Sequence, residues 1–168
     1  MPRRGNGFTL IELAVVLLII AIAVTVAFPR FGSGIVERAR LRNSANRIAN
    51  VAEYAHQRAA CARLTHLLHL DTANGTYWIT GQTSNGQTAP ITDNLGLKGR
   101  LAEGVRFAGV ELRDMDADSD DIVTIRFSPQ GWADPAAIQL IGSTGETMSV
   151  IIDELSGQVQ TRKLEEMN

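Results

Sequence analysis

Residues 8–28 form an apolar run of 21 residues in which Glu12 is the only charged side chain. An α-helix rises about 1.5 Å per residue, so a helix of this length reaches across the roughly 30 Å hydrocarbon core of a bilayer. The run is too long for a buried core helix in a chain of 168 residues. It therefore predicts a membrane-spanning helix, in which a carboxylate is costly and needs a function.

A cleaved secretory signal peptide is the alternative interpretation of this run. Signal peptides have an apolar core of about 7–15 residues followed by small residues at the cleavage site. Small residues do occur near Ala27, but the run is longer than such a core. Basic residues lie before it, at Arg3 and Arg4, and after it, at Arg30, so the positive-inside rule leaves the orientation open.

The order of residues at the start of the run is more specific than its hydropathy. A short basic leader ends in Gly7, and Phe8 is followed by Thr-Leu-Ile and Glu12. This sequence resembles the class III signal of type IV pilins and of the pseudopilins of type II secretion. The resemblance implies that a prepilin peptidase cleaves between Gly7 and Phe8 and N-methylates Phe8. It also implies that the apolar segment is retained as a membrane anchor and later as the filament core, and that Pro29 kinks the long helix.

The same resemblance suggests a function for Glu12, which would be the fifth residue of the mature chain. In the family, a glutamate at this position is thought to pair with the terminal amine of its own or a neighbouring subunit. That amine has a reference pKa of about 7.7–8.0 and is mostly protonated at neutral pH. We therefore expect Glu12 to set the register of assembly. A tolerated carboxylate at the bilayer edge is the alternative.

The C-terminal part of the chain shows a second resemblance. A strand ending in Phe-x-Pro-x-Gly, a further strand, a turn and a last hairpin with glycine are similar to the H-type minor pseudopilins and the related fimbrial T proteins. The residues that fit this pattern are Phe127, Pro129, Gly131, Leu140 and Gly157.

Residues 35–70 are predicted to form one helix, after a flexible Gly-Ser-Gly stretch at residues 32–34. Apolar residues at alternating spacings of four and three make a single stripe: Leu41, Ala45, Ile48, Ala52, Ala55, Ala59 and Ala62. Because most of them are alanine, a sheet or a neighbouring helix can approach the stripe closely. The arginines between residues 30 and 63 fall largely off the stripe, and we expect them on a solvated face.

The remainder of the chain has the pattern of an antiparallel sheet. Strands are predicted at residues 76–80, 105–112, 122–127, 137–141, 148–152 and 159–163, joined by short links that often contain glycine. No helical crossover separates them, which disfavours a parallel sheet. The predicted fold class is α+β: a long N-terminal helix, membrane-spanning in its first half, packed on antiparallel β-sheet as in pilins.

An acidic stretch is the first candidate for a metal site. Asp114, Asp116 and Asp118 alternate as Ca²⁺ ligands do, but Ser119 and Ile125 stand where an EF-hand requires glycine and glutamate. A solvated loop between two strands explains the same acids, so no metal is expected and these three residues are only weak candidates.

Histidine and cysteine offer two further candidates. His66 and His69 would share one face near the helix end, with Asp71 beyond, but no third or fourth zinc ligand accompanies them. Cys61 lies beside the stripe, and we expect it to be a small buried residue rather than a nucleophile, since His56 is poorly placed as its base.

No sequence motif indicates catalysis. The chain has no G-x-S-x-G, no Walker loop and no distinct pair of catalytic carboxylates, so we expect no enzyme and no cofactor. The formal net charge of −2 argues against nucleic-acid binding, and so do Glu165 and Glu166 beside Arg162 and Lys163 in the tail.

The two resemblances together imply a structural protein with four segments. These are a leader (1–7), a transmembrane helix (8–29), an amphipathic continuation of the helix (30–70) and a periplasmic antiparallel β head (71–168). The implied function is that of a minor pseudopilin in the periplasmic pseudopilus of a type II secretion system, anchored once in the inner membrane. Its partners would be other major and minor pseudopilins, the inner-membrane secretion platform and the prepilin peptidase. The alternative is a fimbrial T-type minor pilin that binds DNA during uptake.

Overall fold

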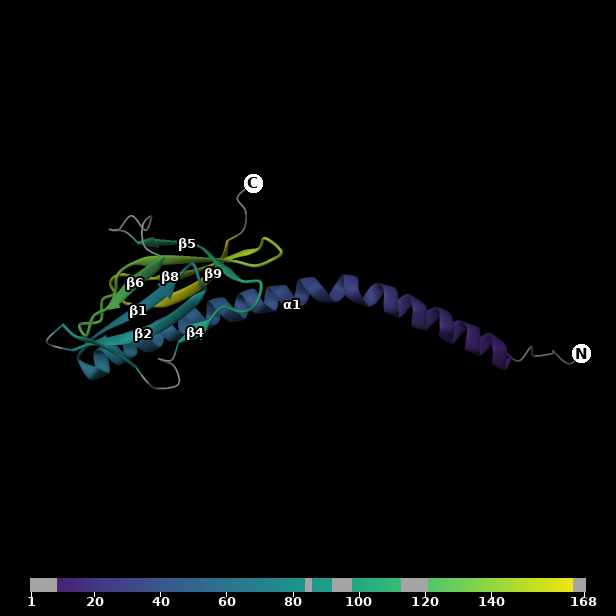
Figure 1. Ribbon diagram of the computed structural model, residues 1–168, viewed down its shortest axis with the longest axis horizontal. Helices are drawn as coiled ribbons and strands as arrows, with labels where there is room; N and C mark the ends of the chain where they lie inside the picture. The colour runs from purple at the N-terminus through teal and green to yellow at the C-terminus, as the bar shows by residue number, and fades with distance from the viewer. Residues whose placement is uncertain (1–8, 84–85, 92–97, 113–120, 165–168) are drawn as a thin grey trace, which may run out of the picture. The chain divides into compact units, whose positions relative to one another are not determined.

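One long helix, α1 (Leu10–Ala62), begins the fold (Figure 1). The computed structural model describes residues 9–83, 86–91, 98–112 and 121–164, with side chains for all of these except 26–33 and 164. The backbone is helical through Pro29 and through the Gly-Ser-Gly stretch at 32–34. The chain divides into two units, Met1–Val36 and Glu37–Asn168. The second unit, which contains every strand, is called the head below.

The alanine stripe of α1 is confirmed as the face that packs on the sheets of the head. Leu41, Ala45 and Ile48 are buried, as are Ala52, Ala55 and Ala59, whereas Ala62 is exposed at the helix end. Four of these six buried residues are alanine, so the sheets lie close to the helix backbone.

The predicted helix end at residue 70 is wrong. The helix α1 stops at Ala62, and residues Thr65–Asp71 form strand β1. Arg63 has a φ of 55°, the left-handed conformation that commonly ends helices and that glycine usually supplies. The head therefore begins well before residue 71.

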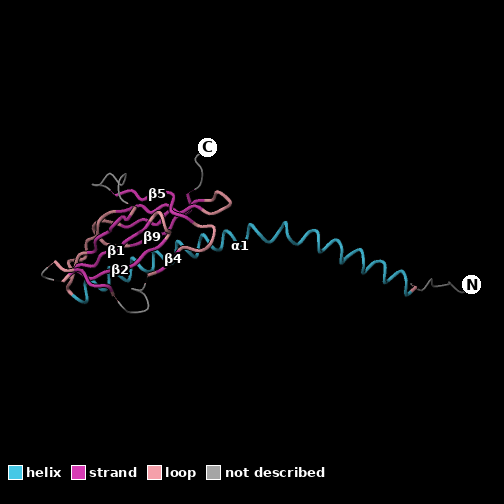
Figure 2. The backbone as a smooth tube through the Cα atoms, viewed as in Figure 1, coloured by secondary structure: helices cyan, strands magenta, loops and turns pink. Residues whose placement is uncertain are grey.

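The described residues form nine strands in two antiparallel sheets (Figure 2). The first sheet has the order β3-β2-β1-β6, with β4 paired to β2; the second has the order β5-β7-β8-β9. The bounds are β1 (Thr65–Asp71), β2 (Thr76–Gln82), β3 (Thr88–Pro90), β4 (Gly99–Arg100), β5 (Arg106–Leu112), β6 (Ile122–Phe127), β7 (Ala136–Ile141), β8 (Thr147–Ile152) and β9 (Val159–Leu164). The six predicted strands are confirmed within a few residues, while β1, β3 and β4 were not predicted.

A single hydrophobic core joins α1 to both sheets. It includes the alanine stripe, Leu68 and Leu70 of β1, Phe127 of β6 and Ile138 of β7. An isolated bridge between Phe127 and Ala133 links the end of β6 to the segment that leads into the second sheet. The predicted fold class is thus confirmed: a long N-terminal helix packed on antiparallel sheet, with two sheets in place of one.

Candidate processing and assembly sites

The start of α1 is a capped helix terminus. Thr9 precedes the helix, and the backbone amide of Glu12 donates a hydrogen bond to the Thr9 hydroxyl oxygen (3.3 Å). The amide of Leu13 donates to the Thr9 carbonyl (3.2 Å), which closes the first turn. Threonine followed three residues later by glutamate is the pattern of a capping box, and a carboxylate in a first turn favours the helix dipole. Thr9 therefore caps the helix through the backbone amide of residue 12, and the Glu12 carboxylate lies in the first turn.

The part of α1 in the first unit exposes apolar side chains on every side. From Leu10, which is 88% exposed, to Val24, which is 55% exposed, none of the large hydrophobic residues is buried. A helix that is apolar all around is typical of a segment that other apolar groups surround, whether lipid or neighbouring helices. Among the residues that the structure describes, no helix meets both the length and the apolarity that a bilayer crossing requires.

Several sequence-derived candidates lie outside the described residues. These are Gly7 and Phe8 at the proposed cleavage site, and Asp114, Asp116 and Asp118 of the acidic stretch. Within the described part of the chain, no group of three or more His, Cys, Asp or Glu side chains could hold a metal ion.

The two histidines do not form the pair that the sequence suggested. They lie on strand β1, where an odd spacing places them on opposite faces: His66 is buried and His69 is half-buried. The Nδ1 of His66 donates to the Leu64 carbonyl (3.0 Å). His69 shares hydrogen bonds with the hydroxyls of Thr124 (3.0 Å) and Thr80 (2.8 Å). The expectation that His66 and His69 share one face of a helix is therefore wrong.

His69 belongs to a row of side chains across the first sheet. Its ring stacks on Trp78, with centroids 5.2 Å apart, and the Nζ of Lys98 lies 5.0 Å from the centre of the Trp78 ring. Burial lowers the pKa of His69 below its usual 6.5. This neutral imidazole joins β1 to β2 and β6, so its role here is structural.

The prediction for Cys61 is also wrong, because its side chain is exposed. It lies near the end of α1, one position off the stripe, where Ala60, Ala62 and Arg63 are exposed as well. The stripe is buried as far as Ala59, and the last residues of the helix are exposed.

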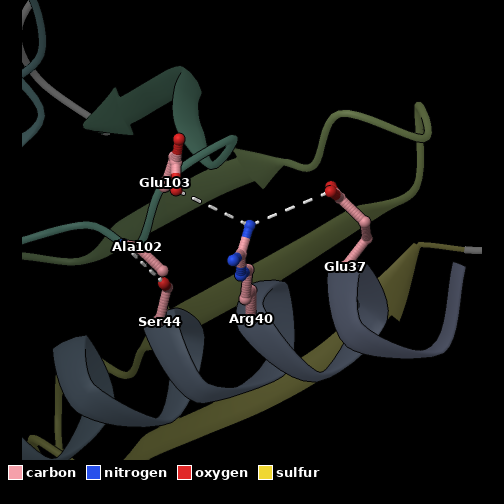
Figure 3. Close-up of polar contacts among 5 residues, drawn as sticks. All are labelled: Glu37, Arg40, Ser44, Ala102 and Glu103. Carbon is pink, nitrogen blue, oxygen red and sulfur yellow. Dashed lines mark hydrogen bonds and ion pairs between the residues drawn. The ribbon is translucent and has the colours of Figure 1, made fainter. Parts of the chain in front are cut away.

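Ion pairs and a hydrogen bond connect two loops of the head to α1 where this helix enters the second unit. The Arg40 guanidinium lies 3.9 Å from carboxylate oxygens of both Glu37 and Glu103, and the amide of Ala102 donates to the Ser44 hydroxyl (3.2 Å) (Figure 3). Arg38 pairs with Glu146 of the β7–β8 turn at 2.7 Å. The arginines expected on a solvated face are largely exposed, but these two also orient the loops around the helix.

The last hairpin of the head turns at Asp153–Gly157. Its Asp153 carboxylate accepts hydrogen bonds from the amide (2.9 Å) and hydroxyl (2.8 Å) of Ser156, and from the Leu155 amide (3.2 Å). These bonds, first that of the Ser156 amide, lower the pKa of Asp153. Leu140 is buried in β7, and Gly131 and Gly157 both have positive φ. Core packing explains Leu140 of the C-terminal sequence pattern, and backbone conformation explains its two glycines.

Comparison with known families concerns the N-terminal part. The family described as "Prokaryotic N-terminal methylation motif" matches residues 2–28, a range that includes Gly7, Phe8 and Glu12. A comparison with curated protein sequences finds no match.

Solved structures share the fold over about four fifths of the chain. The minor pseudopilin EpsH of the Vibrio cholerae type II secretion system is similar with a TM-score of 0.62 and 14% identity, over 79% of this chain and 99% of that chain. GspH of E. coli is similar with a TM-score of 0.60 and 14% identity, over 82% of this chain and 98% of that chain. This chain has a type IV pilin-like fold.

A third similar structure comes from a pilus rather than a secretion system. The type IV minor pilin FimU of Pseudomonas aeruginosa has a TM-score of 0.55 and 14% identity, over 76% of this chain and 92% of that chain. The fold does not distinguish the secretion system from the pilus, because all three likenesses have the same low identity.

Proposed function

We propose that this pilin-like protein is a minor pseudopilin, a structural subunit of the periplasmic pseudopilus of a type II protein secretion system. The observation that carries the proposal is the helix of the first unit, whose exposed apolar side chains lie within the residues 2–28 that match the methylation motif. Such a helix is stable only when apolar surroundings cover it, first lipid and then the helices of other subunits.

The proposal assigns a role to each segment. Residues 1–7 form the leader, Gly7 and Phe8 flank the peptidase cut, and Phe8 becomes the N-methylated terminus. Residues 8–29 anchor the chain once in the inner membrane, and the head stands in the periplasm. The partners are other major and minor pseudopilins, the secretion platform and the prepilin peptidase.

Glu12 carries the assembly step in this proposal. Inside a filament, the first turn of α1 is surrounded by apolar helices, and a bare carboxylate there needs a cationic partner. The amine freed at Phe8 by cleavage is the nearest candidate in the sequence, four residues before Glu12. Pairing with this amine, in the same or a neighbouring subunit, fixes the axial register.

The second candidate is a minor pilin of a type IV pilus, including the fimbrial T type that binds DNA during uptake. The likeness to FimU favours a pilus subunit in general. Against DNA binding, residues 93–168 carry fourteen acidic and seven basic side chains.

Variants of Glu12 test the assembly role against the capping role. We expect Glu12→Leu to leave membrane insertion and the head fold intact, yet to abolish cross-linking to other pseudopilins and secretion in a complemented null strain. Glu12→Gln keeps an amide that can serve the helix cap but removes the charge, and it should fail in the same way.

Thr9→Ala is the matched control, because it removes the cap and leaves the carboxylate. Loss of a cap costs about 0.5–2 kcal/mol of helix stability, which a long anchored helix tolerates. Normal secretion by Glu12→Leu, or an equal defect in Thr9→Ala, would show that the carboxylate has no assembly role. If the wild-type chain restores piliation or DNA uptake in its null strain, and not secretion, this result would support the second candidate.

A further inference from the structure

A polar groove of about 600 Å³ lies on the head between α1 and the segment that follows β4. Its base includes Ser44 and Leu101, which are buried. Its sides are formed by side chains from one face of the helix and from the β4 strand: Arg40, Asn43, Asn46, Arg47, Asn50 and Arg100. Helical spacing explains the row, because residues 43, 46, 47 and 50 fall on the same side of α1.

The groove is cationic. Three arginines and three asparagines line it, and no carboxylate does so among the described residues. Arg40 is held by Glu37 and Glu103 at one end. Arg47 and Arg100 are exposed, and within the described part of the chain neither forms an ion pair.

The lining chemistry suits a peptide that carries carboxylates. A guanidinium presents paired donors that match a carboxylate, and an asparagine amide both donates to and accepts from a peptide backbone. A nucleic acid fits less well, because a long polyanion needs many phosphate contacts and the groove is lined by three arginines.

The chain itself carries a segment of the required chemistry. Between β5 and β6 the sequence reads DMDADSDD, with five aspartates in eight residues. Figure 1 shows β5 on the side of the head away from α1 and β4. Contacts between unlike faces of successive subunits are the kind that propagate along a helical filament.

We propose that this groove binds an acidic polypeptide segment on the head of a neighbouring pilin-like subunit, with Arg47 and Arg100 pairing with its carboxylates. The inference rests on the proposed assembly role, whereas its test measures binding alone. Failure of the Glu12 experiment and failure of the groove are therefore distinguishable.

The probe is a fluorescent peptide of residues 114–121, DMDADSDD, added to the full chain in non-ionic detergent. Fluorescence anisotropy should report binding that weakens with added salt, because exposed ion pairs are screened. A peptide with asparagine in place of every aspartate should not bind. The double variant Arg47→Glu, Arg100→Glu should lose about tenfold or more in affinity, since each reversal replaces an attraction with a repulsion.

Arg42→Glu is the matched control, because Arg42 is exposed on the same helix but does not line the groove. It should keep the wild-type affinity, and both variants should keep the wild-type melting midpoint. Equal binding by the double variant, or an equal loss in Arg42→Glu, would overturn the proposal. Tighter binding of single-stranded DNA than of the peptide, lost in the double variant, would overturn it in favour of a nucleic-acid site.

Discussion

Gly157, in the turn between β8 and β9, lies so close to His56 on α1 that a Cβ atom at residue 157 would overlap the imidazole ring. The φ of Gly157 is 62°, which glycine adopts without strain. The Nδ1 of His56 is buried, and among the described residues it has no hydrogen-bond partner. This contact lets the last hairpin close on the helix.

Gly157→Ala should therefore destabilise the head by about 1–3 kcal/mol, because it combines backbone strain with overpacking. Urea denaturation followed by tryptophan fluorescence measures the loss. Gly145→Ala is the control, since its φ is also positive, at 82°, but nothing lies within 4 Å of a Cβ there. It should cost less. Equal losses in the two variants would mean that the contact with His56 contributes nothing.

Enlarging the alanine stripe should also destabilise the head. Ala55 is fully buried where α1 packs on the sheets, so Ala55→Leu forces extra volume into a close-packed interface and should cost about 1–3 kcal/mol. Ala60→Leu, at an exposed position of the same helix, should be nearly neutral. The same urea titration tests both. A neutral Ala55→Leu would show that the helix does not lie close against the sheets.

The pH dependence of stability should carry a contribution from His69. The pKa of His69 is lowered in the folded state, so the unfolded chain binds the proton more tightly. This contribution to stability is complete above pH 6.5 and is lost as the pH falls from 6.5 to the folded-state pKa. Melting midpoints of wild type and His69→Gln across this window measure it. Wild type should lose more stability on acidification than the variant, and parallel profiles would contradict the assignment.

The alanine stripe and most strands were predictable because their periodicity is local to the sequence. The buried residues from Leu41 to Ala59 follow helical spacing, and β6 alternates buried Val123, Ile125 and Phe127 with less buried neighbours. These patterns depend only on which face of an element meets the core.

The end of the helix was not predictable in the same way. Leu64, Leu67 and Leu68 keep a helix-like spacing into β1, and the residue that ends α1 is Arg63 rather than a glycine. An arginine in the left-handed backbone conformation cannot be recognised from the sequence as a helix end, whereas a glycine often can. The exposure of Cys61 and the opposite faces of His66 and His69 follow from this one boundary.

The candidate sites also differ in whether a local sequence pattern or only the tertiary structure reveals them. Glu12 stood out because a carboxylate in an apolar run is conspicuous, whereas its relation to Thr9 needed the helix start. The cationic groove brings Arg100 next to Arg47 only through the pairing of β4 with β2. Residues so far apart in sequence are joined by tertiary structure, which one sequence does not reveal.

Intact-mass analysis of the chain, co-expressed with and without a prepilin peptidase, tests the central claim most directly. The account predicts that the peptidase removes residues 1–7 and leaves a chain that begins at Phe8 and carries one added methyl group on its terminal amine. Replacing Gly7 with a bulky residue should block this cut. A chain that keeps its first seven residues in the presence of the peptidase, or one cleaved near Ala27, would contradict the account of a pilin-like assembly subunit.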